Sequence, residues 1–290
     1  RQEYTRIRMA EGAVPSRPTP LPDDDSFWRI YEKGETIGRG HFAKVKLVRH
    51  RESGGFYAAK ILDKMLEEHQ EDYESMMREF KVLRSLNHKN IVNLQDAYET
   101  PTSLILVCEL ATGGELMHRI AEENDIYTED EVRRHCYVIL ETIGFMHQNG
   151  VVHRDLKPEN ICFTTPDLQW IKLIDLGAAG FDSPEGLTEL CGTPLYAAPE
   201  VTPWYWVRND EQAQRCRRYG REVDCWSAGI TLFVMLTGEA PFEQEQPVER
   251  LLQDVCNAPI DLSGAQWRRI SPQAKHLVQG LLTRVASRRT

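Results

Sequence analysis

The stretch His153-Arg154-Asp155-Leu156-Lys157-Pro158-Glu159-Asn160 is the part of this sequence that decides its fold. Two shorter strings follow it in order, Asp175-Leu176-Gly177 and Ala198-Pro199-Glu200. Upstream lie a glycine-rich string over residues 38–43 and the run Tyr57-Ala58-Ala59-Lys60. The shorter strings recur by chance in unrelated chains, so each is weak by itself. Their order along one chain, around the eight-residue stretch, is what makes them informative.

The overall composition excludes several classes of protein. The 290 residues carry 35 Lys and Arg against 44 Asp and Glu, a net charge of −9. This balance argues against a nucleic-acid partner, because a protein that binds nucleic acid needs a basic face. It favours a basic partner. No apolar stretch approaches the ~20 residues that cross a bilayer, so we expect no membrane partner. Residues 1–10 lack the apolar core of a secretory signal, and the seven cysteines form no C-x-x-C pair, which predicts a cytoplasmic protein with reduced thiols.

Hydrophobic periodicity divides the sequence into two parts, each long enough to bury a core. In the first part, alternating runs predict strands over residues 31–37, 43–48, 56–61, 92–98 and 103–109, with one helix over 68–86. The first three strands are typical of an antiparallel meander. In the second part, helical spacing predicts helices over residues 129–148, 222–236, 247–256 and 271–283. Between them we expect a small hairpin over 161–163 and 170–174, and a long functional loop over 175–200.

These patterns predict an α+β chain with two lobes. Residues 1–26 hold four prolines and then three aspartates with almost no apolar periodicity, which is typical of a flexible tail. We expect a mostly β lobe over residues 27–112 and a mostly helical lobe over 113–290.

The glycine-rich string Gly38-Arg39-Gly40-His41-Phe42-Ala43 is a candidate phosphate-binding turn. A dinucleotide-binding turn would need a helix after it, whereas residues 43–48 alternate as a strand. The sequence therefore favours a hairpin whose backbone N–H groups approach phosphate, and an ordinary glycine hairpin is the alternative. Lys60, on the third strand, could hold phosphate, and Glu79, in the helix, could orient Lys60. Either charge alone is more often a solvated surface group.

Together, these residues resemble the catalytic domain of eukaryotic protein kinases of the serine/threonine type. The resemblance covers residues 30–290 and implies a bilobal kinase fold, with an antiparallel β-sheet lobe containing one main helix and a mostly helical second lobe. It implies transfer of the γ-phosphate of ATP, with Mg²⁺, to Ser or Thr hydroxyls of protein substrates. Such transfer depends on positioning and charge neutralisation, with carboxylates on the metal and cations on the phosphates.

The resemblance also implies a role for each matched residue. Asp155 would orient the attacking hydroxyl, Lys157 would steady the phosphoryl group, and Asn160 and Asp175 would bind Mg²⁺. Lys60, held by Glu79, would fix the α- and β-phosphates. The other implied nucleotide-binding residues are Ile37, Gly38, Gly40, Val45, Ala58, Glu109, Ala111, Glu115 and Cys162.

Two further residues have implied structural roles in the second lobe. Glu200 is expected to pair with Arg288. Asp224 is expected to tie the stretch over 153–160 to the buried helix over 222–236.

The sequence departs from the kinase pattern in three places. Ala43 replaces the third glycine. Leu176 replaces the usual phenylalanine, and it can still fill an apolar column with Leu83, Leu94 and His153. The segment over residues 202–218 is longer than usual and rich in Trp and Arg. It is either a docking surface or a plain surface insertion. Ala43 and Leu176 are the features that favour a pseudokinase, a nucleotide-binding scaffold without transfer. The intact catalytic residues oppose this alternative.

Finer features resemble the calcium/calmodulin-dependent kinase group. They are the hinge over residues 109–116 and the string Leu190-Cys191-Gly192-Thr193-Pro194. Residues 98–103 suggest the death-associated protein kinase branch, although Arg154 departs from that branch. Relatives continue past residue 290 into a final helix and often a calmodulin-binding segment, so calmodulin would be a partner only through a segment absent from this chain.

Charged residues near the motifs suggest substrate choice and regulation. Glu115 and Glu159 lie where related enzymes read basic residues upstream of the acceptor. Arg154 needs a negative partner, which in related enzymes is a phosphate on the activation loop. We hypothesise that Glu189 supplies this charge permanently, and Thr188 is the competing phosphorylation site.

Overall fold

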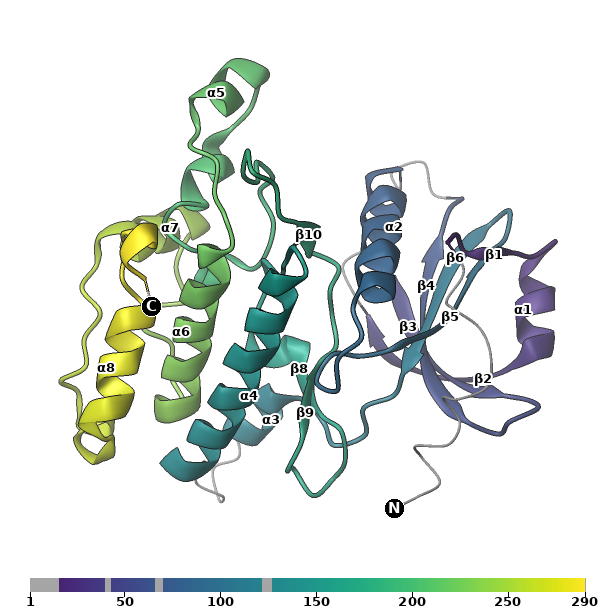
Figure 1. Cartoon of the computed structure of the whole chain (residues 1–290), viewed down its shortest axis with the longest axis horizontal. Helices are drawn as coiled ribbons and strands as arrows, with labels where there is room; N and C mark the ends of the chain where they lie inside the picture. The colour runs from purple at the N-terminus through teal and green to yellow at the C-terminus, as the bar shows by residue number, and fades with distance from the viewer. Residues whose placement is uncertain (1–15, 40–42, 66–69, 122–126, 290) are drawn as a thin grey trace. The chain divides into compact units, whose positions relative to one another are not determined.

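The computed structural model describes residues 16–39, 43–65, 70–121 and 127–289 (Figure 1). These residues form two compact units. The first holds the described chain up to Arg84 together with Asn93–Leu110, and the second holds Ser85–Val92 and the chain from Ala111 onward. The expected boundary at 112/113 is close to this division, but the segment 85–92 joins the second unit. No helix of the described chain is both long and apolar enough to cross a membrane.

The first unit is built on a six-stranded sheet (Figure 1). Its spatial order is β1 (Thr19–Pro20), β5 (Leu94–Glu99), β6 (Ser103–Glu109), β4 (Phe56–Asp63), β3 (Lys44–His50) and β2 (Tyr31–Arg39). The short β1 pairs with β5 in parallel, and the other neighbours are antiparallel. The predicted meander of the first three strands, β2, β3 and β4, is confirmed.

A short helix before this meander corrects the predicted tail. Helix α1 (Asp24–Ile30) begins at Asp23, whose side chain accepts the Ser26 N–H at 2.7 Å. The Thr100 hydroxyl donates to Asp24 at 2.6 Å, and Leu21 packs against the core cluster around Phe27. The prediction of a flexible tail is therefore wrong for residues 16–26, while residues 1–15 lie outside the described chain. These contacts are made to residues distant in the sequence, so local periodicity gives no sign of them.

The one long helix of the first unit is α2 (Gln70–Ser85). Its apolar side chains Met76, Phe80 and Leu83 recur at helical spacing and are buried. Glu79 lies among them and is only 4% exposed. A carboxylate so deeply buried requires a partner, because removing a charge from water is costly.

The second unit is mostly helical. Helix α4 (Glu129–Gln148) begins with a capping box in which Thr128 and Glu131 satisfy each other's backbone N–H groups. It packs against α6 (Glu222–Thr237), which also packs against α8 (Pro272–Leu281) (Figure 1). Most side chains of α6 are buried, as its continuous apolar sequence predicts. The other helices are α3 (Leu116–Ala121), α5 (Asp210–Arg215) and α7 (Val248–Asn257).

Two small antiparallel strand pairs position the motif residues of the second unit. Strand β7 (Val151–Val152) pairs with β10 (Gly180–Phe181), and β8 (Ile161–Phe163) pairs with β9 (Ile171–Leu173). The loop over 153–160 runs from β7 to β8, and the loop over 174–179 runs from β9 to β10. Both loops therefore start and end on paired strands, which brings two segments distant in the sequence to the same place.

The insertion over residues 202–218 forms a 3₁₀ turn, η4 (Thr202–Trp206), followed by α5. Trp204 is buried, and its indole N–H donates to Arg217 O at 3.2 Å. Trp206 is 47% exposed. One tryptophan thus anchors the insertion, while its role as a docking surface stays a prediction.

Candidate active site

The loop over residues 153–160 is anchored by Asp224 on α6. The Asp224 carboxylate is fully buried and accepts the backbone N–H groups of His153 and Arg154, each at 2.8 Å. His147 Nε2 lies 2.7 Å from the same carboxylate. Burial works to raise the pKa of Asp224, but the hydrogen bond and charge of His147 and the Arg154 N–H outweigh it and lower that pKa. The expected tie between Asp224 and this loop is confirmed.

Asp155 lies at the centre of a dense polar cluster. Its Oδ1 accepts both the backbone N–H and the hydroxyl of Thr193, each at 2.8 Å. Its Oδ2 accepts Asn160 Nδ2 at 3.0 Å and lies 3.1 Å from Lys157 Nζ. Lys157 Nζ in turn donates to the Thr193 hydroxyl at 2.6 Å. These contacts bring together three of the predicted catalytic residues, Asp155, Lys157 and Asn160.

Thr193 belongs to this cluster, although it was not among the predicted site residues. It follows Gly192, whose φ of 86° is a left-handed conformation that favours glycine. A Cβ at Gly192 would lie only 2.3 Å from Arg154 O, so the chain must carry glycine to pass this close to the loop. The adjacent pair Gly192-Thr193 was the signal in the sequence that could have identified Thr193.

Asn160 and Asp175 are the two residues that the sequence predicts as metal ligands. The Asn160 side chain uses its Nδ2 on Asp155, which directs its amide oxygen away from that bond. Ile174 N donates to Asn160 O at 3.0 Å, so Asn160 and Asp175 lie at the same end of the β8–β9 hairpin. An amide oxygen and a carboxylate are ligands that suit Mg²⁺, which usually takes one or two protein carboxylates together with substrate phosphates and water. The residues present therefore fit the metal.

In the first unit, Lys60 and Glu79 form a close ion pair. Lys60 Nζ lies 2.7 Å from Glu79 Oε2, and the two side chains are 23% and 5% exposed. Lys60 lies on β4 and Glu79 on α2, so the pair joins the helix to the sheet. Of the two charges, the lysine is the one that reaches the surface. The expected ion pair is confirmed.

The predicted nucleotide-binding residues of the first unit lie on neighbouring strands. Gly38 on β2 is opposite Val45 on β3, and Val45 is opposite Lys60 on β4. Ile37, on β2, is 44% exposed. Ala58 lies further along β4 and Glu109 ends β6. Gly40 lies outside the described residues.

The remaining nucleotide-binding candidates lie in the second unit. Glu115 and Cys162 are paired in an isolated antiparallel bridge, which brings the end of the hinge (residues 109–116) alongside β8. Burial, with a smaller contribution from Glu115, raises the pKa of the Cys162 thiol to about 12. Ala111 begins this part of the second unit. The predicted residues are thus assembled in two groups, one within each unit.

The expected pair of Glu200 and Arg288 is wrong by one residue. The Glu200 carboxylate binds Arg289 through two parallel hydrogen bonds, at 2.7 and 2.9 Å. Arg289 also donates to Glu222 O at 2.7 Å, and its guanidinium lies 5.4 Å from the centre of the Trp226 ring. The 3₁₀ turn η6 (Ala286–Arg288) ends just before Arg289 and directs this residue inward. Two adjacent arginines cannot be distinguished from the sequence alone.

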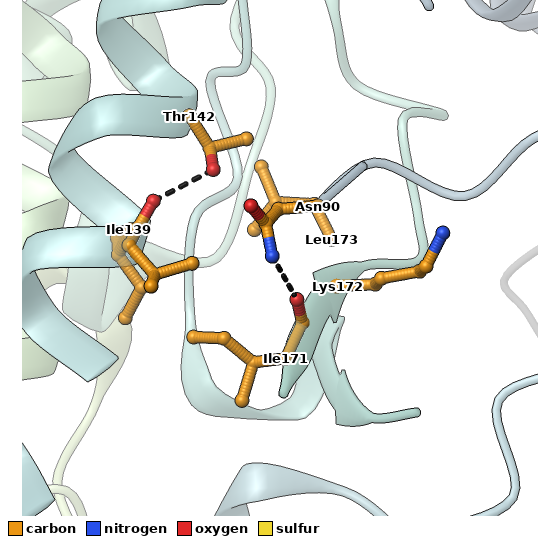
Figure 2. A pocket seen from close by; sticks show the side chains of 7 residues that line it. Asn90, Ile139, Thr142, Ile171, Lys172 and Leu173 are labelled. Carbon is orange, nitrogen blue, oxygen red and sulfur yellow. Dashed lines mark hydrogen bonds between the residues drawn. The ribbon is translucent and has the colours of Figure 1, made fainter. Parts of the chain in front are cut away.

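A small pocket in the second unit contains none of the predicted site residues. It is lined by Asn90, Val138, Ile139, Thr142, Ile171, Lys172 and Leu173 (Figure 2). Asn90 Nδ2 donates to Ile171 O at 2.8 Å, while its Oδ1 has no hydrogen-bond partner among the described residues. Leu173 N also donates to Asn90 O at 2.9 Å. These contacts fasten the segment 85–92 to β9, which is a structural role.

Comparison with known proteins agrees with the motifs. The protein kinase domain family matches residues 31–290. Calcium-dependent protein kinase 20 of Oryza sativa subsp. japonica is 40% identical over 87% of this chain and 44% of its own length. Calcium/calmodulin-dependent protein kinase type 1 of Caenorhabditis elegans is 37% identical over 87% of this chain and 68% of its own length.

A third relative is the probable serine/threonine-protein kinase fhkC of Dictyostelium discoideum, 34% identical over 87% of this chain and 41% of its own length. The chain therefore spans less than half the length of the first and third relatives. The family match over nearly all of the chain, together with these relatives, shows that it belongs to the protein kinase family, in the calcium/calmodulin-dependent kinase group.

Proposed function

We propose that this chain is an active kinase domain that transfers the γ-phosphate of ATP to serine or threonine hydroxyls of protein substrates. The observation that carries the proposal is the cluster around Asp155, in which the carboxylate is held by Thr193, Asn160 and Lys157. Positioning is the main catalytic requirement of phosphoryl transfer. A carboxylate fixed from several sides meets that requirement.

Asp155 would act on the acceptor hydroxyl. Its Oδ1 is fixed by Thr193 and its Oδ2 by Asn160, so the carboxylate cannot rotate freely. As the acceptor oxygen attacks the γ-phosphorus, its proton passes to the Asp155 carboxylate and the bond to the β-phosphate oxygen breaks. The Lys157 ammonium, 3.1 Å from Asp155, is placed to neutralise charge on the transferred group.

Nucleotide binding would depend on the predicted residues of the first unit and on those of the second unit. Asn160 and Asp175 would hold Mg²⁺, which when bound neutralises the charge of the phosphate oxygens. Lys60 would bind the α- and β-phosphates as a point charge, and Glu79 keeps its ammonium in one orientation. The apolar residues Val45, Ala58 and Cys162 would contact the base.

Glu159 supports a preference for basic residues upstream of the acceptor. Its Oε2 is buried and has no hydrogen-bond partner among the described residues. Tyr196, which is buried, lies close enough for the Glu159 charge to contribute to raising its pKa, after the larger effect of burial. A buried carboxylate oxygen without a donor is costly, and an Arg or Lys of a bound peptide would relieve that cost. Glu115 would provide a second carboxylate.

We further propose a cytoplasmic location and a signalling role. None of the seven cysteines, all of which lie in the described part of the chain, forms a disulfide, which fits a reducing compartment. The name of the Caenorhabditis elegans relative includes calmodulin, so calmodulin is a candidate partner of a longer protein that contains this domain. The alternative of a scaffold without transfer is opposed by the intact Lys60–Glu79 pair and by the contacts of Asp155.

Radiolabel transfer from ATP and Mg²⁺ to a basic peptide tests this function. The wild-type chain should label the peptide, and Asp175→Ala should not, because the variant loses a metal ligand. Equal labelling by both proteins would indicate a contaminating kinase. Absence of labelling by the wild type, with ATP binding retained, would favour the scaffold.

A further inference from the structure

Arg154 is a buried cation directly before Asp155. Its side chain is 2% exposed and its backbone φ is 67°, in the left-handed region that non-glycine residues rarely adopt. Such strain persists only where the surroundings hold it. Here the Arg154 N–H donates to Asp224 and the side-chain Nε donates to Ala178 O at 2.7 Å. A buried guanidinium held in this way still requires a negative charge nearby.

Glu189 provides that charge. Its Oε2 lies 3.1 Å from Arg154 Nη1, and its side chain is 50% exposed. Burial works to lower the pKa of Arg154, but Cys191, Tyr219 and Glu189 outweigh it and raise that pKa. The guanidinium is therefore charged, and its partner is a carboxylate that needs no modification to carry its charge.

Tyr219 holds the backbone on which Glu189 lies. Its ring is buried and its hydroxyl donates to Glu189 O at 2.5 Å. Two backbone hydrogen bonds also join Tyr219 to Leu187. Leu187 N donates to Tyr219 O at 2.7 Å, and Tyr219 N donates to Leu187 O at 3.1 Å. Burial, before any other cause, raises the pKa of Tyr219, so its hydroxyl stays a neutral donor.

The path of the chain over residues 186–189 also depends on its contact with residues 218 and 219. Gly186 has a φ of 84°, and a Cβ there would lie 2.9 Å from Arg218 Cβ and 3.1 Å from Tyr219 O. The chain over residues 186–189 therefore passes directly against residues 218 and 219, at the end of the insertion. From there it continues to Gly192 and Thr193, which contact the loop of Asp155.

We propose that Tyr219 is a positioning residue, which holds residues 187–191 so that Glu189 stays paired with Arg154 and the segment is set for catalysis without phosphorylation. This inference rests on the kinase function proposed above. Tyr219 acts through Glu189 and Arg154 and touches no reacting atom. Because the carboxylate is permanent, phosphorylation of the neighbouring Thr188 is not needed for activity.

The test compares Tyr219→Phe with the wild type after phosphatase treatment, with loss of phosphate verified by mass spectrometry. The variant keeps the ring and the backbone bonds and loses one hydroxyl. We expect treated and untreated wild type to transfer phosphate at the same rate. The kcat of Tyr219→Phe should fall by about three- to tenfold, because the hydroxyl's contacts to Glu189 O, Cys191 Sγ and the Arg154 side chain are lost together, with little change in the KM for ATP.

Amide hydrogen exchange supplies a readout that does not depend on activity. In Tyr219→Phe, exchange should accelerate over residues 185–193 and stay unchanged in α4 and α6. Glu189→Gln should produce the same local pattern of exchange. The loss of kcat in the double variant, expressed as a free energy, should be smaller than the sum of the losses in the two single variants, since both substitutions act on one contact. Tyr205→Phe is the matched control, because it removes a tyrosine hydroxyl with an exposed contact, to Glu249, away from residues 185–193.

Two outcomes would overturn the inference and leave the kinase function standing. One is an enzyme that loses activity on phosphatase treatment and regains it on rephosphorylation. The other is an active Tyr219→Phe whose exchange over residues 185–193 equals that of the wild type. If neither treated nor untreated wild type transfers phosphate, the proposed function itself fails, and this inference fails with it.

Discussion

Thr193 donates to Asp155 Oδ1 twice, through its backbone N–H and through its hydroxyl, each at 2.8 Å. The two residues lie in different segments, the loop between β7 and β8 and the chain that precedes η3 (Pro194–Tyr196). The contact therefore couples the conformation of the chain over residues 187–193 to the carboxylate that would act on the substrate. If the segment moved, Asp155 would lose two of its hydrogen bonds.

Replacing the Thr193 hydroxyl should lower the rate of transfer. In Thr193→Val the backbone hydrogen bond remains, while Asp155 and Lys157 each lose a contact to the hydroxyl. We expect kcat to fall by about 10-fold, the equivalent of one charge-assisted hydrogen bond. Steady-state kinetics on a basic peptide measures this loss. Thr193→Ser restores the hydroxyl and should recover most of the rate; a serine variant as slow as valine would contradict the assigned contact.

Breaking the Lys60–Glu79 pair should weaken nucleotide binding. Glu79→Gln leaves the Lys60 ammonium without its carboxylate at 2.7 Å. The lysine then samples more orientations, and we expect the KM for ATP to rise by about 10-fold, or about 1.4 kcal/mol. Glu99→Gln is the matched control, because Glu99 pairs with Lys64 at 2.9 Å in a more exposed position. That variant should leave the KM for ATP unchanged, because the pair that it breaks does not include Lys60.

Asp224 should make the protein sensitive to acid. Its folded pKa lies below the ordinary value of 3.8. A carboxyl group with a lowered folded pKa stabilises the fold above its unfolded pKa, and this stabilisation is lost as the pH falls from about 4 toward the folded pKa. Urea unfolding between pH 7 and pH 3 should show this loss in the wild type.

Asp224→Asn removes this titration, but at neutral pH it places a hydrogen-bond donor opposite another donor. The two Asp224 oxygens accept separate backbone N–H groups, from His153 and Arg154, and an asparagine presents an NH₂ to one of them. We expect a loss of about 2–3 kcal/mol at pH 7. The difference in stability between the wild type and the variant should shrink on acidification; a difference that is constant with pH would contradict the lowered pKa.

Glu159 should determine the choice of peptide. In Glu159→Gln the charge is lost with little change of shape, so the KM for a peptide with upstream Arg should rise by about 10-fold. The KM for a peptide without basic residues should not change. The ratio of kcat/KM values for the two peptides measures the effect. Glu185→Gln serves as control, since the Glu185 side chain is 79% exposed. If the ratio is the same in Glu159→Gln and the wild type, Glu159 does not read the substrate.

Local features of the sequence predicted the elements well. The helix over residues 129–148 and the strand over 103–109 agree with α4 and β6 at both ends. The reason is that hydrophobic spacing and caps such as Thr128 act over a few residues. The order of the motifs carried the resemblance to protein kinases, and that resemblance pointed to Asp155, Lys157 and Asn160, which are residue types that phosphoryl transfer uses.

Contacts between distant segments were decided only by the tertiary structure. Residues 16–26 were expected to be a tail, yet within the first unit Leu21 packs against the core cluster and Asp24 accepts a hydrogen bond from Thr100. Glu200 binds Arg289 rather than Arg288, and Tyr219 reaches the backbone of Glu189 from the end of the insertion. By itself, the sequence determined which groups the chain carries and where its helices and strands form. Which of those groups meet depends on packing between elements far apart in the chain, and no local pattern encodes that.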